Sequence, residues 1–557
     1  MKSISVTTRI SPPSSLSLIG VVALVVAVVA IYVLRVDHVA GIIGDDAWYV
    51  VLAKSIAEGT GPRLISSAGT QFVSTVYPPA FPAILSLVFL VSPQFPDNMM
   101  LLKAVSIAGM IGAGFLTYLF AARYRGLPRA LSIAIGVATV LTPSLVFLAT
   151  STLMSEPVFL SIQLLAVLLI ERTARIDDER YGSAILAGLL AAVAFLTRTA
   201  GMTVAAAGVI YLARNRRWRS VVVFGATVAV CVAPWLLYAR ANAPTRAELV
   251  DHGGLMAIPY GQQFWTTEAG TITAPLATAD MLPMRVVDNI TNIAIRDIGG
   301  IFAPLLFRSP SESGLEVLGL GPPDRKKLLT PSMGQALGTK IISLLMTLVA
   351  VVGFVAACRK RLTVAEPMVA LALGMIVLWP FWTFRFVLPL VPFLLVYFVL
   401  GLETLAGWLG QLHRAMTPTP FAVGRIFLMV IIGLHVMDHA QYIALAYGDR
   451  FGGQWKSEAA GIHQVIDWIR EHPTPPGAVA ADNPALVYLY TGRQTIAQDS
   501  YDDNYAAKRS RWERMGVRYV VSLVAGLPLV DKRAELRFKL PERNVWAYEL
   551  LQQEPAR

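Results

Sequence analysis

Two adjacent acidic residues are the first candidates for chemistry in this chain. Asp45 and Asp46 open the segment Gly44–Gly59, which predicts a short amphipathic helix with Asp45 as its N-cap and Gly59 at its C-terminal end. Capping accounts for one carboxylate. A second carboxylate beside it raises the local negative charge, so at least one of the pair needs a cation, a metal or a proton nearby. Such a pair can act as a general base towards a hydroxyl or an amine, and it can hold a divalent ion.

A third acidic candidate, Glu156, stands directly before Pro157 at a predicted helix start. A carboxylate at that position is favoured by the positive end of the helix dipole, which is a sufficient structural explanation. The alternative is that Glu156 completes a metal site with Asp45 and Asp46 or positions an acceptor. Both interpretations stay open at the level of sequence.

The composition places the elements that carry these residues in a membrane. Of 557 residues, 55% are hydrophobic and only 15% are charged, whereas soluble domains carry charge at about a quarter of their positions. The mean hydropathy is +0.58. The net charge of +11 would suggest nucleic-acid binding in a soluble protein. Here the excess Lys and Arg lie in short connections between apolar runs, which is typical of cytoplasmic loops. We therefore expect no nucleic-acid partner.

Eleven apolar runs predict a polytopic, mainly α-helical protein. The first run is long enough to span a bilayer and no cleavage site follows it, so we expect a cytoplasmic N-terminus. Every arginine-rich connection then falls on the cytoplasmic side. Two runs are short and could form a re-entrant pair instead. The two short runs are 183–196 and 200–213. The predicted spans are 16–34, 100–122, 128–149, 157–171, 183–196, 200–213, 220–239, 338–358, 364–380, 384–402 and 421–445.

Three segments on the outer side are too long to be simple connections. Residues 36–99 and 240–337 are expected to be outer loops of a transmembrane domain covering residues 1–445. Residues 446–557 are more polar, and helical and strand-like stretches alternate in them. We predict that they form a small extracytoplasmic C-terminal α/β domain. Its strand-like stretches are 478–481 and 517–524.

The predicted topology puts two arginines on the same side of the membrane as the acids. Arg198 and Arg385 each lie between apolar runs at the outer boundary, where positive charge is not favoured. Snorkelling to lipid headgroups accounts for either side chain. A planar donor that can bind in a bidentate manner also suits an anionic ligand such as a lipid phosphate. We expect at least one of the two to bind phosphate.

Other motifs point to structure rather than chemistry. His435 and His439 lie one helical turn apart, with Asp438 between them, and we favour a satisfied interfacial cluster over a metal site. The glycines of segment 109–114 lie within a predicted span and predict a close-packing face. The sequence contains no Walker A loop, zincin motif or nucleophile elbow, which argues against an ATP-driven pump and a serine hydrolase.

The order of these motifs over residues 15–400 resembles the GT-C superfamily of integral-membrane glycosyltransferases. Within it, the likeness is to the bacterial branch related to protein mannosyltransferases and to the lipid A aminoarabinose transferases. The segments that carry the resemblance are Asp45-Asp46-Ala47-Trp48-Tyr49, Tyr77-Pro78-Pro79, Ser155-Glu156-Pro157, Arg198 and Arg385-Phe386-Val387-Leu388-Pro389. The tail looks like the outer domain that many of these proteins append.

The resemblance implies a GT-C fold and transfer of a hexose or pentose from a polyprenyl-phosphate donor, with inversion. The acceptor would be a glycan, a lipid or a protein on the outer face of the bacterial inner membrane. By this likeness Asp45, with Asp46 at the second place of the acidic pair, is the catalytic base or holds a divalent cation such as Mg²⁺ or Mn²⁺. Glu156 matches the second acidic site. The donor phosphate is assigned to Arg198, Arg385 and Lys54.

Two other function classes stay open at this stage. A secondary transporter or lipid flippase also has many spans and charges at the membrane boundary, but it would bind its substrate near the midplane. An oligosaccharide polymerase or ligase uses similar donor lipids but tends to place its function in one large outer loop. The segment 240–337 keeps this third class under consideration.

Overall fold

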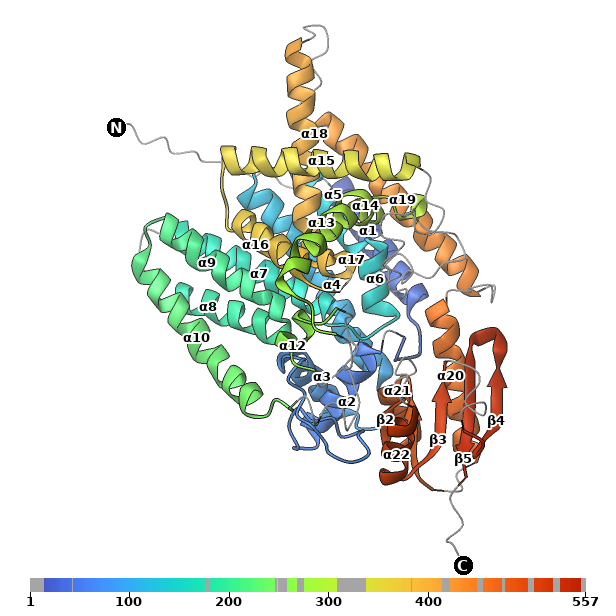
Figure 1. Ribbon diagram of the computed structural model, residues 1–557. Coiled ribbons are helices and arrows are strands. Elements are labelled where there is room, and N and C mark those ends of the chain that lie inside the picture. Colours follow the sequence, from blue (N-terminus) through green and yellow to red (C-terminus); the bar gives the residue numbers. More distant parts are fainter. Residues whose placement is uncertain are drawn as a thin grey trace, which may run out of the picture.

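The protein is described from a computed structural model, and most of the described residues are helical (Figure 1). Parts of the predicted outer loop 240–337 and of the predicted C-terminal domain 446–557 lie outside the described residues. The structure describes residues 15–42, 44–175, 181–245, 248, 258–267, 275–307, 337–381, 383–412, 421–447, 454–472, 476–498, 505–523 and 531–551.

The described helices of the bundle follow the predicted apolar runs, with short helices between them, and three further helices lie in the C-terminal part. They are α1 (Ser15–Arg35), α2 (Asp45–Ala57), α3 (Ala80–Val91), α4 (Met99–Leu119), α5 (Arg129–Val140), α6 (Pro143–Thr150), α7 (Glu156–Arg175), α8 (Tyr181–Thr197), α9 (Met202–Arg214), α10 (Trp218–Ala241), α12 (Tyr260–Phe264), α13 (Leu282–Asn292), α14 (Ile298–Phe302), α15 (Leu337–Lys360), α16 (Ala365–Leu378), α17 (Thr383–Val387), α18 (Val391–Leu412), α19 (Ala422–Tyr447), α20 (Gln454–Glu471), α21 (Pro484–Thr491) and α22 (Tyr505–Arg514).

The chain is a multi-pass membrane protein, as the composition predicts. Six of the described helices are long and apolar enough to cross a membrane, and seven if α5 and α6 form one span bent by 52°. The bend falls at Thr142-Pro143, where proline cannot continue the backbone hydrogen bonds of α5. Five further apolar helices, α8 and α9 among them, are shorter. The predicted number of eleven spans therefore stays a prediction.

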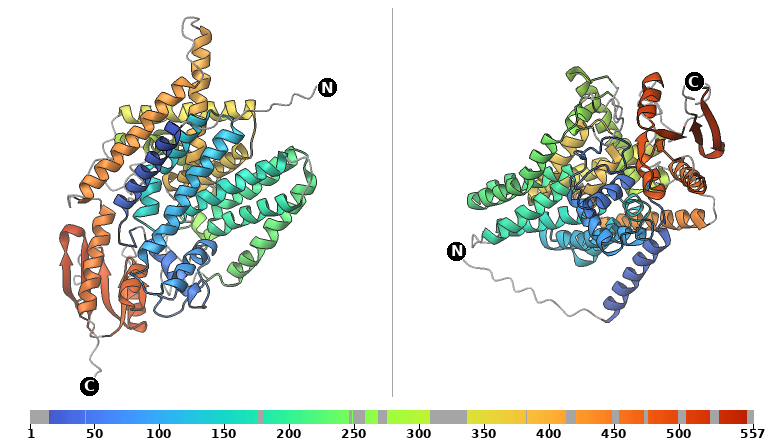
Figure 2. Two further views of the ribbon diagram at one scale, coloured as in Figure 1. Left: turned by 180° about the vertical axis from the view of Figure 1, so that it is seen from behind. Right: turned by 90° about the horizontal axis from the view of Figure 1, so that it is seen from below.

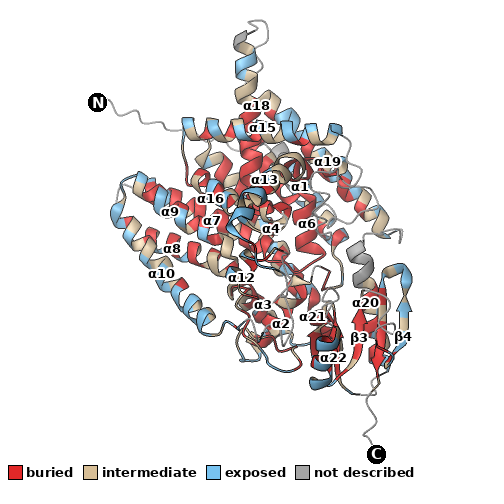
Figure 3. Ribbon diagram, viewed as in Figure 1, coloured by how far each residue is buried: buried red, intermediate tan, exposed pale blue. Residues whose placement is uncertain are grey.

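The interior of the bundle is formed by the helices that carry the candidate residues. In α7, 72% of the residues of the most apolar stretch are buried, and in the span formed by α17 and α18 the share is 83%. The corresponding share for α10 is 17%, so this helix lies at the periphery (Figure 3). The elements that bring Glu156 and Arg385 into the structure are thus its best-packed parts.

The glycines of segment 109–114 form a close-packing face, as predicted. A Cβ atom on Gly109 would lie 2.9 Å from the carbonyl oxygen of Pro157, so α4 and α7 are in backbone contact there. Further along α4, the neighbour is α5: a Cβ on Gly136 would lie 2.7 Å from the carbonyl oxygen of Gly114. Small residues let the three helices approach closely, which is the usual way in which helices associate in lipid.

The arginine-rich connections gather at the end of the bundle that is remote from Glu156. Arg175 ends α7, 19 residues and about 28 Å along the helix from Glu156. Its guanidinium lies 4.5 Å from the ring centre of Tyr124. Close by, Arg125 donates through Nη1 to the carbonyl of Arg361, at 3.0 Å. This grouping agrees with the prediction that these connections share one side of the membrane.

The C-terminal part of the described chain contains a small five-stranded sheet with helices, in agreement with the predicted α/β domain. Its order is β2-β1-β3-β5-β4, in which β2, β1 and β3 are parallel and β3, β5 and β4 are antiparallel. The predicted strand-like stretches are β1 and β3, whereas β2 and the hairpin formed by β4 and β5 were not predicted. The strands are β1 (Ala478–Ala481), β2 (Thr495–Ala497), β3 (Val517–Ser522), β4 (Ala534–Leu540) and β5 (Val545–Leu550).

The sheet is docked on the loop that carries the acidic pair. The backbone nitrogen of Thr495 in β2 donates to the carbonyl of Ser66 at 2.7 Å, and the nitrogen of Ala68 donates to the carbonyl of Thr495 at 2.8 Å. Residues 66–68 therefore extend the edge of the sheet by one short bridge. Both views of Figure 2 show the sheet beside the end of the bundle that holds α2 and α3.

Candidate active site

Asp45 is the first residue of α2, and its carboxylate points away from its own helix. The N-cap position is taken by Gly44, with φ 87°, and the described structure gives α2 no side-chain cap. The prediction that Asp45 caps this helix is therefore wrong, because the N-cap is the preceding residue, a glycine with positive φ, and Asp45 is the first residue of α2 itself. Gly59 follows α2 with φ 78°, as expected for a glycine at a helix C-terminus. Asp45 is thus left to make contacts with other elements.

Arg385 joins the two acids that the sequence could only place on the same side. Its Nη1 donates to Asp45 Oδ2 at 2.7 Å, and its Nε donates to Glu156 Oε1 at 2.6 Å. Arg385 lies in α17 and Glu156 begins α7, so the cluster unites three elements that are up to 340 positions apart in sequence. The Glu156 side chain is fully buried, whereas 21% of the Asp45 side chain is exposed. The acid at the surface and the acid in the interior therefore share one guanidinium.

Arg198 adds a second positive charge to the same cluster. It lies between α8 and the turn η2 (Thr199–Gly201), and its Nη1 is 2.9 Å from Glu156 Oε1 and from the hydroxyl of Ser155. The Ser155 hydroxyl also lies 3.0 Å from the hydroxyl of Tyr49. Within the described residues, the buried Nε of Arg198 and Oε2 of Glu156 have no hydrogen-bond partner. The cluster therefore holds two carboxylates against two guanidinium groups and still offers a buried N–H donor.

Tyr77 completes the surroundings of Asp45. Its hydroxyl donates to Asp45 Oδ1 at 2.9 Å, and its ring centre lies 4.7 Å from that of Tyr49. Burial, and next to it the Asp45 carboxylate, raise the pKa of the Tyr77 hydroxyl well above its usual value, so the phenol keeps its proton and acts as a donor. Both oxygens of Asp45 consequently accept hydrogen bonds from other elements.

Three residues of the cluster were missed in the sequence, although two carried a signal. Tyr49 stands four residues after Asp45, the spacing that places two side chains on one helix face. Ser155 stands directly before Glu156, and it was quoted only as part of the segment Ser155-Glu156-Pro157. Tyr77 was quoted only as part of the segment Tyr77-Pro78-Pro79, without a role of its own. Nothing in the local pattern connects Tyr77 with Asp45, because the loop between them folds through contacts with the C-terminal sheet.

Asp46 faces a different group of atoms from its neighbour. Its Oδ2 accepts hydrogen bonds from the backbone nitrogens of Gly41, at 2.8 Å, and Ile42, at 3.2 Å, and the residue is fully buried. The carbonyl of Gly41 in turn accepts a hydrogen bond from the amide nitrogen of Asn483 at 2.8 Å. Asp46 and the C-terminal domain thus both hold Gly41, in the segment that precedes α2.

Lys54 and the histidine pair lie apart from this cluster. Lys54 is 3.8 Å from Glu58 on its own helix and 5.3 Å from the ring centre of Tyr488 in α21. The structure therefore does not bring it to Asp45. The imidazoles of His435 and His439 bind the backbone carbonyls of Ile301 and Leu141, each at 3.0 Å. Nδ1 of His435 has no hydrogen-bond partner among the described residues, so the predicted satisfied cluster is buried but not fully satisfied.

The acids as they lie do not form a metal site. A guanidinium stands between Asp45 and Glu156, and the Asp46 carboxylate is engaged with backbone nitrogens. Among the described residues there is no group of three or more His, Cys, Asp or Glu that could hold a metal ion. The positive charge that the acidic pair requires is supplied by arginine instead. A requirement for a divalent cation stays a prediction.

Comparison with known proteins identifies the fold. No family model matches the chain, and no curated protein matches its sequence. Among solved structures, the Archaeoglobus fulgidus oligosaccharyltransferase tethered with an acceptor peptide matches with a TM-score of 0.53 and 14% identity, over 90% of this chain and 68% of that one. The same enzyme in complex with Zn and sulfate gives 0.52, with 14% identity over 92% and 71%. ArnT from Cupriavidus metallidurans in the apo state gives 0.49, with 12% identity over 96% and 98%.

The chain has the GT-C fold. This confirms the fold that the sequence resemblance implied. At these identities the likeness concerns the arrangement of the chain alone, so the chemistry of the GT-C chain described here has to be argued from its own residues.

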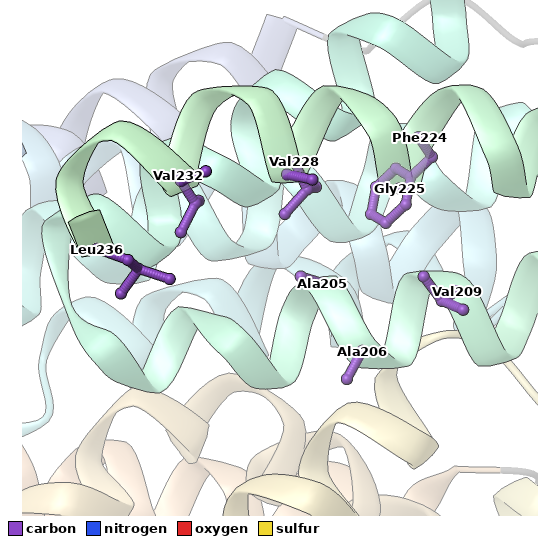
Figure 4. A pocket seen from close by; sticks show the side chains of 10 residues that line it. Ala205, Ala206, Val209, Phe224, Gly225, Val228, Val232 and Leu236 are labelled. Atoms are coloured by element: carbon purple, nitrogen blue, oxygen red, sulfur yellow. The ribbon is translucent and has the colours of Figure 1, made fainter. Parts of the chain in front are cut away.

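An apolar groove lies between two helices of the GT-C chain, on the flank that carries Arg198. It is formed by α9 and α10 and has a volume of about 380 Å³ (Figure 4). The groove begins at Ala205, seven residues beyond Arg198. Its lining residues are Ala205, Ala206, Val209, Phe224, Gly225, Val228, Ala229, Val232, Ala233 and Leu236. The apolar lining suits a hydrocarbon chain and offers no group for catalysis.

The different surroundings of the two adjacent aspartates lead to a test. We expect Asp46→Asn to lower the free energy of unfolding by about 2 kcal/mol, because two buried hydrogen bonds lose their charged acceptor. The folded fraction of this variant should keep turnover within a few fold. Thermal unfolding in detergent, combined with turnover per folded molecule, measures both quantities. If Asp46→Asn were stable yet inactive, a direct catalytic role for Asp46 would follow instead.

Proposed function

We propose that the protein transfers a sugar from a polyprenyl-phosphate donor to an acceptor, with inversion at the anomeric carbon. The observation that carries the proposal is the Asp45–Arg385–Glu156 cluster with Arg198 beside it. It combines a partly exposed carboxylate with two guanidinium groups at one end of a GT-C bundle. These are the groups that a base-assisted displacement of a phosphate leaving group requires.

Asp45 is proposed as the general base. As the acceptor oxygen or nitrogen attacks the anomeric carbon, Asp45 takes the proton from it, and the bond from that carbon to the phosphate oxygen breaks. The electron pair leaves with the polyprenyl phosphate. A carboxylate at the first residue of a helix, with 21% of its side chain exposed, can be reached by an acceptor from the aqueous side.

Arg385 and Arg198 are proposed to bind the donor phosphate and to stabilise the charge that develops on it. Both side chains are oriented by Glu156 Oε1. Glu156 is fully buried, so its role in this proposal is to position the two arginines rather than to meet the acceptor. The buried Nε of Arg198, without a partner among the described residues, supports the assignment of an anion to this place.

The apolar groove between α9 and α10 is proposed to hold the hydrocarbon tail of the donor. Gly225 allows this to be tested, because a Cβ on it meets nothing within 4 Å, so a larger residue fills the groove without disturbing the helices. We expect Gly225→Leu to raise the KM for a long-chain donor about tenfold and to leave a short-chain analogue unaffected. Gly374→Leu in α16, whose Cβ is also unobstructed and which lies outside the groove, is the matched control. Equal KM values for the two variants would contradict the assignment.

The orientation in the membrane is also a proposal. We place the arginine-rich end of the bundle in the cytoplasm and the cluster, residues 36–99 and residues 446–557 outside the bacterial inner membrane, according to the positive-inside rule. We further propose that acceptor selection lies in 240–337 and in the C-terminal domain.

The decisive experiment compares the envelope of a strain lacking this gene with that of its parent. Mass spectrometry of glycolipids and glycoproteins should show the loss of one hexose or pentose. The purified protein should then turn over the corresponding polyprenyl-phosphate sugar. An unchanged envelope and no turnover of any such donor would contradict the proposed function, and transport of an intact lipid-linked sugar would favour a flippase.

A further inference from the structure

Arg385 is committed to two carboxylates in the structure, although it is one of the two groups proposed to bind the donor phosphate. Its Nε and Nη1 hold Glu156 and Asp45 at 2.6 and 2.7 Å, and only 14% of the side chain is exposed. A guanidinium binds phosphate best through its planar fork of parallel N–H groups. That fork is occupied in part by Asp45, so phosphate and Asp45 compete for the same donor.

Asp45 is held in an equally restrictive way. Arg385 donates to Oδ2 and Tyr77 donates to Oδ1, so each carboxylate oxygen already accepts a hydrogen bond. Each oxygen keeps a second lone pair for an acceptor proton, but the two hydrogen bonds fix the carboxylate in its position beside Arg385 and Tyr77. The structure therefore shows Asp45 held against Arg385 rather than turned towards an acceptor, and Arg385 sharing Nη1 with a carboxylate rather than with a phosphate.

We propose that the donor phosphate displaces Asp45 from Arg385, so that donor binding releases the base. This inference rests on the function proposed above and adds the order of binding, with the donor before the acceptor. The exchange keeps the charge on Arg385 compensated throughout, because one anion replaces another. Once released, Asp45 turns to the acceptor while Arg385 stays attached to Glu156 through Nε.

The burial of the two acids explains why Asp45 leaves and Glu156 stays. Glu156 is fully buried at the start of α7 and also compensates Arg198, so its departure would leave two buried charges uncompensated. Asp45 lies at the first residue of α2, partly exposed, and can be solvated when it leaves Arg385. Tyr77 opposes this release, because its hydrogen bond favours the position of Asp45 beside Arg385.

The test measures the dissociation constant of undecaprenyl phosphate, the probe for the leaving group, with the full-length protein in lipid nanodiscs. We expect Asp45→Asn to bind it about tenfold more tightly than the wild type, since Arg385 is no longer shared with a carboxylate. Tyr77→Phe keeps every charge and weakens only the hold on Asp45, so we expect about threefold tighter binding. Asp467→Asn removes an exposed carboxylate from α20 and controls for the loss of one negative charge.

Unchanged or weaker binding by Asp45→Asn would overturn the exchange. A second result would also overturn it: Asp45→Asn binds undecaprenyl phosphate more tightly only at low salt, and Tyr77→Phe binds it like the wild type. The removal of a negative charge alone would then explain the tighter binding. Tyr77→Phe also covers the case in which Asp45→Asn disturbs α2. If the wild-type protein bound no polyprenyl phosphate, the proposed function would be refuted as well. If the wild type bound it and both variants bound it with the same affinity, only the exchange would be refuted.

Discussion

Asp45→Asn is expected to lower kcat about 10³-fold, within the range usually contributed by a positioned general base. Asparagine keeps the size and the hydrogen-bond acceptor of the side chain but cannot take up the proton of the acceptor. The hydrogen bond from Tyr77 can persist, and the pair with Arg385 is partly exposed, so the fold should be retained. Turnover of the donor identified from the envelope comparison, measured per folded molecule, gives the effect.

The control for this variant is Asp467→Asn, which makes the same chemical change at a side chain that is 66% exposed on α20. It should behave as the wild type in both turnover and thermal unfolding. If Asp45→Asn retained more than a tenth of the wild-type kcat while folding normally, Asp45 would not be the base. A transporter would also be nearly insensitive to this substitution, so the same measurement separates the two classes.

Gly401→Ala is expected to prevent the formation of a stable protein. Gly401 in α18 crosses α15 so closely that its Cβ would fall on the carbonyl of Val349 and lie 3.1 Å from the backbone nitrogen of Gly353. Backbone atoms cannot move aside as a side-chain end can, so the two helices would have to separate. We expect a cost above about 3 kcal/mol, beyond the usual range for an overpacked core. Yield of monodisperse protein and thermal unfolding in detergent report this loss.

Gly407→Ala provides the matched control in the same helix. A Cβ at Gly407 meets nothing within 4 Å, so only the intrinsic preference of alanine for a helix applies. This variant should be as stable as the wild type or slightly more stable. Equal stability of Gly401→Ala and Gly407→Ala would show that the crossing of α15 and α18 is looser than the structure has it.

The crossing of α15 and α18 shows how much of the helix packing could be predicted from the sequence. The glycines of segment 109–114 were recognised as a close-packing face because three of them recur within one span. Gly353 and Gly401 lie in helices whose other glycines are at least six residues away, and nothing in either segment indicates that the two meet. Such a pair becomes visible only when two helices that are remote in sequence are brought together.

The short apolar helices mark the limit of prediction from hydropathy. The runs at 183–196 and 200–213 were located correctly, yet their length does not decide whether they span a bilayer. With 17 residues, α8 is at the lower limit of a spanning helix. The hairpin of β4 and β5 was missed for another reason. The burial of β4 alternates only weakly, and most of its side chains are exposed, as is common for a strand at the edge of a sheet.

What the sequence determined by itself is the membrane class, the positions of the apolar helices and the residue types Asp45, Glu156, Arg198 and Arg385 at one side of the bundle. These follow from local chemistry, because length and hydropathy act within a single segment. What only the tertiary structure decided is how the charges are shared: Arg385 compensates Asp45 and Glu156 together, and Asp46 is directed to backbone nitrogens. Adjacent residues on a helix point in different directions, and which partner each one meets depends on elements hundreds of positions away.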